Sequence, residues 1–153
     1  MTRSYRQALN ATVTGVAIVT TRVAGLPLGE TVTGLDSLSD EPPLLLVTVT
    51  PGLAAAIQTR GAFAVNVLGD HQADLAEIFR GSEPGFAARD WWPVSGGGLP
   101  RLHGAAAQFE CEVDRVHVAG TRVLVIGAVG RAVRGAAMPL AYTRRGYAAP
   151  LAA

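Results

Sequence analysis

The chain of 153 residues has a single cysteine, few charged residues and no apolar run of the length that a membrane span needs. A transmembrane helix takes about 20 consecutive apolar residues, and the first residues, Met1–Arg6, lead into polar alternation instead of the apolar core of a signal peptide. These absences predict a cytoplasmic protein. The lone Cys111 cannot form a disulfide within the chain, and its alternating, acidic neighbours predict a buried and unreactive thiol on a strand.

Charge is also scarce. The formal net charge is +1 and 16% of the residues are charged, whereas binding to nucleic acid or to a membrane surface calls for a concentrated basic face. The composition therefore excludes both partners and favours small molecules or other proteins. Because 49% of the residues are hydrophobic, one subunit would have difficulty covering its apolar surface, and we expect a subunit interface.

Several familiar catalytic motifs are missing. No Gly-x-Gly-x-x-Gly follows a strand pattern and no phosphate-binding Walker loop is present, so a nicotinamide cofactor would not be held in a Rossmann site. The three histidines, His71, His103 and His117, lack the short spacing of metal ligands, so no metal site is expected. Nothing in the sequence supports a hydrolytic triad.

The order of the elements predicts one mainly β domain over residues 1–153, with a loose tail from about residue 148. β-branched and alternating runs predict strands at 12–21, 30–38, 44–50, 63–68, 106–118 and 122–133. Short helices are expected at 4–10, at 51–59 after Pro51, and at 72–80 with Asp70 as N-cap. Since a parallel sheet would need a helix between most strands, we expect an antiparallel, Greek-key split β-barrel of six or seven strands with two or three short helices.

Two segments invite a functional interpretation. Residues 31–43 are rich in Thr, Ser and Gly, whose small side chains and open N–H groups let a planar or anionic ligand approach the main chain. An ordinary strand and turn would have the same composition. Trp91 and Trp92 lie in a long irregular connection, where they either anchor a subunit interface or cap one end of the barrel.

An ordered series of segments resembles the short-chain flavin reductases. It runs from Tyr5–Val16 and Thr31–Pro43 through Gly61–Leu68, Leu99–Gly104 and Val123–Gly127 to Tyr142 and Tyr147, and it covers nearly the whole chain. The resemblance implies an FMN-binding split barrel that forms a homodimer and binds FMN or FAD near the subunit interface. NADH or NADPH would deliver hydride to the flavin, and the reduced flavin would leave for a partner monooxygenase.

The resemblance also implies a set of flavin contacts. Residues of the 31–37 segment would line the isoalloxazine ring, with backbone groups from Thr33, Gly34 and Leu35 and a hydroxyl from Ser37. An adjoining strand edge would come from the next β segment. The cofactor-binding residues expected in this way are Thr31, Thr33, Gly34, Leu35, Ser37, Ala64, Val65 and Asn66, with Gly52, Leu53 and Arg80 near the phosphate. The protein would supply fixed donors, while the redox chemistry belongs to the flavin.

Two departures from the family pattern concern the phosphate and the nicotinamide. A Ser-x-Thr pair that binds the flavin phosphate is replaced by Pro51–Leu53, so only backbone N–H groups of Gly52 and Leu53, with Arg80, remain as donors. Arg122 stands where many relatives have a histidine near the flavin and nicotinamide. Arginine cannot relay a proton near neutral pH, so Arg122 either binds an anionic group or is an exposed strand residue.

The third departure from the family pattern concerns two acidic residues. Asp36 and Glu30 replace neutral residues, and a carboxylate beside the ring would oppose reduced anionic flavin by about 4 kcal/mol at 4 Å and an effective dielectric near 20. Either these acids are solvated on the outer face of the strand, or the barrel has a different ligand and holds no flavin. In that alternative Asp36 and Glu30 are acid-base residues, with Arg122 as an anion clamp, for a non-redox step such as a cyclisation or isomerisation.

Overall fold

A computed structural model describes residues 1–81, 85–93 and 97–150. Three helices are present in it: α1 (Thr2–Leu9), α2 (Pro51–Arg60) and α3 (Ala73–Ile78). The strands are β1 (Thr14–Gly15), β2 (Ala17–Val23), β3 (Leu26–Val32), β4 (Leu35–Asp40), β5 (Pro43–Val49), β6 (Ala62–Val67), β7 (Ala107–Ala119), β8 (Arg122–Arg134), β9 (Ala141–Thr143) and β10 (Gly146–Ala148). The expected mainly β, antiparallel fold is confirmed.

Seven strands form one sheet in the order β3-β2-β6-β7-β8-β5-β4. Strands β3 and β4 are at opposite edges of this sheet, yet only Thr33 and Gly34 connect them. Two residues cannot span an open seven-stranded sheet, because neighbouring strands are about 4.8 Å apart. The sheet therefore curls into a barrel, and the Thr48 N–H closes the corner by donating to the Gly34 carbonyl at 2.9 Å.

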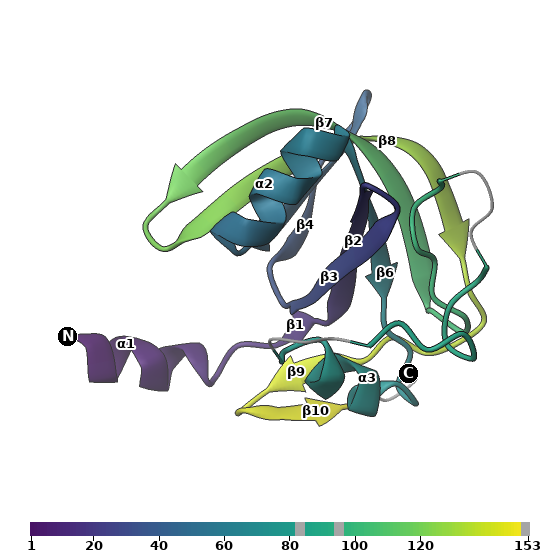
Figure 1. The fold of residues 1–153 in the computed structure, drawn as a ribbon. Coiled ribbons are helices and arrows are strands. Elements are labelled where there is room, and N and C mark those ends of the chain that lie inside the picture. Colours follow the sequence, from purple (N-terminus) through teal and green to yellow (C-terminus); the bar gives the residue numbers. More distant parts are fainter. Residues whose placement is uncertain (82–84, 94–96, 151–153) are drawn as a thin grey trace.

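The barrel interior is the first of two hydrophobic cores. It contains Val47, Phe63 and Val125 from the strands, together with Leu53 and Ile57 from α2. Figure 1 shows α2 lying across the barrel between the β7–β8 hairpin and strands β2 and β3. The burial of Leu53 and Ile57 fixes the position of the α2 N-terminus relative to the strands around it.

The second core lies between the barrel wall and a layer formed by α3 and the C-terminal strands (Figure 1). Alternate residues along β2 and the residue before it serve both cores, since Ala17 and Val19 face the first while Val16 and Ile18 face the second. This alternation follows from the two-residue period of a strand. Strands β1, β9 and β10 form a separate three-stranded sheet that the sequence did not lead us to expect.

The predicted strand boundaries need two corrections. The segment 30–38 is not one strand, because it is divided at Thr33–Gly34 between β3 and β4. The segment 12–21 is divided between β1 and β2 in the same way. The hairpin of β7 and β8, by contrast, agrees with the predicted strands at 106–118 and 122–133 to within one residue at each end.

The helix signals were accurate for α2 and less so for α3. Thr50 is the N-cap of α2, Pro51 occupies its first turn, and Gly61 ends it with a φ of 78°. Asp70 was expected to cap α3, but that helix has Gln72 at its N-cap position. The Gln72 side chain instead accepts from the Gly69 N–H and donates to the His103 carbonyl, and so holds the loop before α3.

Trp91 belongs to the second core, where it contacts Phe79 and Phe86 and is 5% exposed. The interpretation of Trp91 as an interface anchor is therefore wrong. Trp92 is 49% exposed, so the same interpretation of Trp92 stays a prediction.

Three segments assigned from the sequence fall partly outside the described residues: the helix-ending turn 81–85, the glycine run 96–98 and the end of the loose tail. Among the described helices, none is long and apolar enough to cross a membrane.

Candidate functional site

A pocket of about 410 Å³ lies beside the N-terminus of α2. We call it the α2 pocket. It unites four residues that the sequence had assigned to a site, namely Glu30, Gly52, Leu53 and Arg80. The remaining lining residues are Pro27, Leu28, Gly29, Thr50, Phe79 and Gly81. Residues that are distant in sequence meet here because β3, the start of α2 and the end of α3 converge.

Glu30 organises the wall of this pocket. Its carboxylate accepts from the Thr50 N–H at 2.7 Å and from the Thr50 hydroxyl at 2.5 Å. The same hydroxyl oxygen accepts from the Leu53 N–H at 3.4 Å, which is the N-cap interaction of α2. Since a helix N-terminus carries a partial positive charge, a carboxylate placed there is stabilised. Glu30 is thus not a solvated surface acid, because its side chain is 16% exposed and its carboxylate is bonded to the start of α2.

Arg122 lies on the other side of the Glu30 carboxylate. Its guanidinium Nη2 is 3.6 Å from Glu30 Oε1 and donates to the Thr48 carbonyl at 3.1 Å. The Glu30 side chain is 16% exposed and that of Arg122 is 41% exposed. Arg122 therefore pairs with an anionic group, and this group is the Glu30 carboxylate of the same chain.

Arg80 reaches the pocket from the residues after α3. Its Nε donates to the Tyr147 hydroxyl at 2.9 Å, and its guanidinium lies 5.0 Å from the centre of the Tyr142 ring. The Tyr147 hydroxyl donates to Glu77, which is itself 3.6 Å from Arg80. Desolvation and the hydrogen bond to Glu77 raise the pKa of Tyr147 above its ordinary value. The strands β9 and β10 thereby hold Arg80 in place.

The α2 pocket contains paired charges. Glu30 is paired with Arg122, and Glu77 with Arg80, so each arginine near the pocket already has a carboxylate close by. The donors suited to an anionic or carbonyl oxygen are the Gly52 N–H at the start of α2 and the half-exposed guanidinium of Arg80, because the Leu53 N–H already donates to the Thr50 hydroxyl. This arrangement can hold a polar group of a ligand, but it offers a doubly charged group little excess positive charge.

The segment expected to line a flavin ring divides into an inner and an outer part. Thr31 is tied to α3, because its N–H donates to the Phe79 carbonyl at 3.1 Å and its hydroxyl to the Ala76 carbonyl at 2.7 Å. Thr33, Gly34 and Leu35 are half-buried at the barrel corner, and Ser37 is exposed. A Cβ on Gly34 would lie 2.8 Å from Thr48, so only glycine allows this close approach.

Asp36 is exposed on β4 and does not line the α2 pocket. The corner at Thr33–Gly34 lies between Glu30 and Asp36, so the two residues belong to different strands, β3 and β4. The structure thus separates the two carboxylates that the non-redox alternative requires in a single pocket.

Strand β6 is an internal strand between β2 and β7, so the expected strand edge at Ala64–Asn66 is absent from it. Ala64 and Val65 are buried. Asn66 is fully buried, donating to the Ile18 carbonyl at 3.1 Å and accepting from the Leu102 N–H at 3.0 Å. These residues can support a site only as part of the barrel wall.

Sequence reasoning missed Thr50 and Tyr147 as members of the site. A threonine directly before a proline is a recognisable N-cap signal, so Thr50 could have been identified. Tyr147 gave no such signal, since its contact with Arg80 joins segments that are 67 residues apart.

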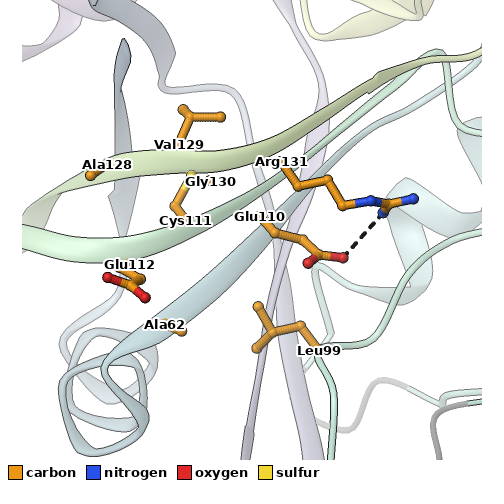
Figure 2. Close-up of a pocket in the computed structure, with 9 residues that line it drawn as sticks. All are labelled: Ala62, Leu99, Glu110, Cys111, Glu112, Ala128, Val129, Gly130 and Arg131. Atoms are coloured by element: carbon orange, nitrogen blue, oxygen red, sulfur yellow. Dashed lines mark hydrogen bonds and ion pairs between the residues drawn. The ribbon is translucent and has the colours of Figure 1, made fainter. Parts of the chain in front are cut away.

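A second pocket, of about 550 Å³, lies on β6, β7 and β8. We call it the hairpin pocket. Figure 2 shows Glu110 directed toward Arg131, with an oxygen to Nη1 distance of 3.2 Å. The neighbouring Cys111 is 2% exposed, and burial together with the Glu110 carboxylate raises the pKa of its thiol to about 12. The expected buried thiol is confirmed, and this pocket contains none of the predicted cofactor-binding residues.

The chain matches known proteins over nearly its whole length. Residues 9–150 match the flavin reductase like domain. A probable flavin reductase of Rhizobium meliloti is 38% identical over 152 residues, which cover 97% of this chain and 49% of that protein, so this chain spans about half of its length. The reductase subunit of a flavin-dependent monooxygenase from Mycobacterium tuberculosis is 38% identical over 130 residues, covering 83% of this chain and 69% of that subunit.

A solved structure is similar over the same extent. The NADH:FAD oxidoreductase of Streptomyces globisporus, crystallised with NAD and FAD fragments, has a TM-score of 0.89 and 27% identity and covers 98% of this chain and 93% of that one. The split-barrel fold, the order of the segments and these matches agree. The chain belongs to the flavin reductase family.

Proposed function

We propose that this protein is an NAD(P)H-dependent flavin reductase that supplies reduced FMN or FAD to a partner monooxygenase. The observation that carries the proposal is the match to the flavin reductase like domain over residues 9–150. The barrel corner and the α2 pocket add to it, because they contain most of the residues expected to contact flavin outside β6.

The donors in the α2 pocket fit a flavin side chain. In this proposal the Gly52 N–H faces the phosphate, the Leu53 N–H is shared between the phosphate and the Thr50 hydroxyl, and Arg80 contributes its guanidinium. Thr33, Gly34 and Leu35 form the half-buried surface against which the ring lies, with Ser37 at its outer end. Bound flavin supplies the hydride-accepting chemistry. Thr31 has a positioning role, since its hydrogen bonds fix α3 and hence the start of the Arg80 segment.

Weak retention of flavin follows from the paired charges. The hydroxyl and N–H of Thr50 are occupied by Glu30, and Pro51 has no N–H to offer. A phosphate in this pocket therefore gains fewer charge-assisted hydrogen bonds than it would at a helix start with free donors. Loose binding suits a protein whose product, reduced flavin, has to leave for another enzyme.

The assembly and location complete the proposal. We propose a homodimer, which the apolar composition favours, and a cytoplasmic location, where NADH and NADPH are present. A monooxygenase partner is supported by the relative from Mycobacterium tuberculosis, which is a reductase subunit of such an enzyme. The non-redox alternative is not favoured, because Asp36 is exposed on β4 while Glu30 is bound to Thr50 and Arg122.

The test uses the purified chain. FMN and FAD are titrated by the change in flavin fluorescence, and oxidation of NADH and NADPH is followed at 340 nm with each flavin added. We expect flavin-dependent oxidation of at least one nicotinamide and a rate that saturates with free flavin. A protein that neither binds flavin nor oxidises a nicotinamide in its presence contradicts the proposal. Comparing FMN with FAD and NADH with NADPH in one assay identifies the preferred pair.

A further inference from the structure

The small C-terminal sheet presents two tyrosines to the segment after α3. Tyr142 on β9 and Tyr147 on β10 are directly opposite each other in the strand register. Side chains of opposed residues project from the same face of a sheet, so the two rings lie together, with their centres 5.5 Å apart. Figure 1 shows α3 alongside these two strands, and hydrogen bonds to Tyr147 join the two parts.

The Arg80 side chain extends over both rings. Its Cζ atom lies 5.0 Å from the centre of the Tyr142 ring and 5.8 Å from that of Tyr147. Both distances are within the roughly 6 Å over which the face of an aromatic ring attracts a guanidinium. The two rings also pack against the second core. They therefore form a fixed support for a side chain that is 38% exposed.

Two linked hydrogen bonds fix the orientation of the Arg80 guanidinium. Its Nε donates to the Tyr147 hydroxyl at 2.9 Å, and this hydroxyl donates to the Glu77 carboxylate at 2.5 Å. Both directions are determined, because an arginine can only donate and an ionised carboxylate can only accept. Removing the Tyr147 hydroxyl would break both bonds and leave the ring in place.

The outer part of the guanidinium is available to a ligand. Within the described residues, the bond to Tyr147 is the only hydrogen bond of the Arg80 side chain, so the N–H groups on Nη1 and Nη2 have no acceptor. Arg80 lines the α2 pocket together with Gly52 at the start of α2. A planar pair of such donors matches two oxygens of a phosphate, provided that the guanidinium is held in the correct orientation.

We propose that Tyr147 is a positioning residue for flavin, which directs the Nη groups of Arg80 at the flavin phosphate and so sets the affinity of the α2 pocket for FMN. The inference rests on the proposed function, because it takes flavin as the ligand of this pocket. Tyr147 is not among the described residues that line the pocket, so its hydroxyl acts only through Arg80. An arginine that is oriented beforehand loses less side-chain freedom when the phosphate binds.

The main test removes one hydroxyl. Tyr147→Phe keeps the aromatic ring below Arg80, so the variant should fold, and its melting temperature checks this. Dissociation constants of FMN and riboflavin are measured by flavin fluorescence for wild type and variant. We expect the FMN constant to rise on the order of 5- to 10-fold, because Arg80 loses a hydrogen bond and the phosphate itself then has to order the guanidinium. The riboflavin constant should not change, because riboflavin has no phosphate.

Steady-state kinetics give a second measurement. The flavin phosphate does not react during hydride transfer, so Arg80 holds it equally in the ground state and in the transition state. Tyr147→Phe should therefore raise the KM for FMN and leave kcat unchanged. A variant that had only lost folded protein would show the reverse, with a lower kcat and an unchanged KM.

A double-mutant cycle tests whether Tyr147 acts through Arg80. Arg80→Ala alone should weaken FMN binding, and the addition of Tyr147→Phe should weaken it no further, because the hydroxyl then has no guanidinium to hold. Tyr5→Phe is the matched control for the loss of a hydroxyl. Tyr5 is 62% exposed on α1 and does not line the α2 pocket, so both dissociation constants should stay at their wild-type values.

Three results would overturn the inference: an unchanged ratio of the FMN and riboflavin constants in Tyr147→Phe, an equal loss of affinity for both flavins, or a loss that persists in the Arg80→Ala background. If the wild type oxidises NADH with added flavin and one of these results is found, the proposed function stands and only the role of Tyr147 is removed. A wild type that neither binds nor reduces flavin overturns both.

Discussion

An arginine–glutamate pair lies at each of the two pockets, and in both a glutamate of the pair lines the pocket. In the hairpin pocket, Glu110 and Arg131 are 34% and 45% exposed, and their contact is between side chains. In the α2 pocket, Glu30 is 16% exposed and also accepts from the main chain at the start of a helix. The same two residue types thus make a surface ion pair in one place and bind the start of a helix in the other.

The two pockets also differ in volume and in the packing around them. The hairpin pocket is the larger, at about 550 Å³ against about 410 Å³. Its side of the barrel is tightly packed, with Gly127 against Phe63 and Cys111. The α2 pocket brings together backbone donors, charged side chains and the neighbouring barrel corner. Four experiments can test this contrast.

The largest loss of stability is expected from a substitution at Gly127, behind the hairpin pocket. A Cβ on Gly127 would lie 2.5 Å from Phe63 Cζ and 2.6 Å from Cys111 Cβ. Gly127→Ala should therefore lower the free energy of unfolding by about 1 to 3 kcal/mol through overpacking, as measured by urea denaturation. Gly130→Ala is the control on the same strand, because its nearest contact would be 3.9 Å. Equal stabilities of the two variants would contradict the close packing seen here.

The next largest effect is the difference in stability between variants of Glu30 and Glu110. Glu30→Ala leaves the Thr50 N–H and hydroxyl and the Arg122 guanidinium without their carboxylate, at a cost of about 1 to 2 kcal/mol in unfolding free energy. Glu110→Ala removes an exposed pair and should cost less than about 1 kcal/mol. Denaturation of both variants in one buffer checks the comparison, and a larger loss for Glu110→Ala would reverse it.

The sequence predicts the elements better than it predicts this contrast. Pro51 and Gly61 mark α2 because their backbone preferences are local, and the alternating pattern of β7 and β8 marks the long hairpin for the same reason. The sequence did not predict the break between β3 and β4 at Thr33–Gly34, because this break depends on the contact of Gly34 with Thr48 on another strand.

The candidate site was predicted in part. The sequence singled out Glu30, Gly52, Leu53 and Arg80, and the fold places them in one pocket. The sequence did not predict which residues form hydrogen bonds with them. The bonds of Glu30 to Thr50 and of Arg80 to Tyr147 join segments whose proximity is decided by the closure of the barrel and by the C-terminal sheet.

Cys111 should make the unfolding free energy of the protein depend on pH. Its folded pKa is raised from 9.0 to about 12, so the neutral thiol is favoured in the folded state. That contribution is complete below pH 9 and is lost as the pH rises from 9 toward 12. From pH 8 to pH 10 the wild type should lose about 1 kcal/mol more than Cys111→Ala. Parallel denaturation curves check this, and an equal loss in both proteins would mean that the thiol is not desolvated.

The smallest expected effect concerns the affinity of the α2 pocket for the flavin phosphate. Glu30→Gln keeps an acceptor for the Thr50 N–H but removes the negative charge from the α2 pocket. An anionic phosphate would then face Arg122 and Arg80 with one carboxylate fewer, so FMN should bind several-fold more tightly. Riboflavin has no phosphate and is the internal control, because its affinity should not change. The ratio of the two dissociation constants, measured by flavin fluorescence, decides the matter. If the ratio is the same in wild type and Glu30→Gln, the flavin phosphate does not bind beside Glu30, and the α2 pocket loses its proposed role even where flavin reduction itself is observed.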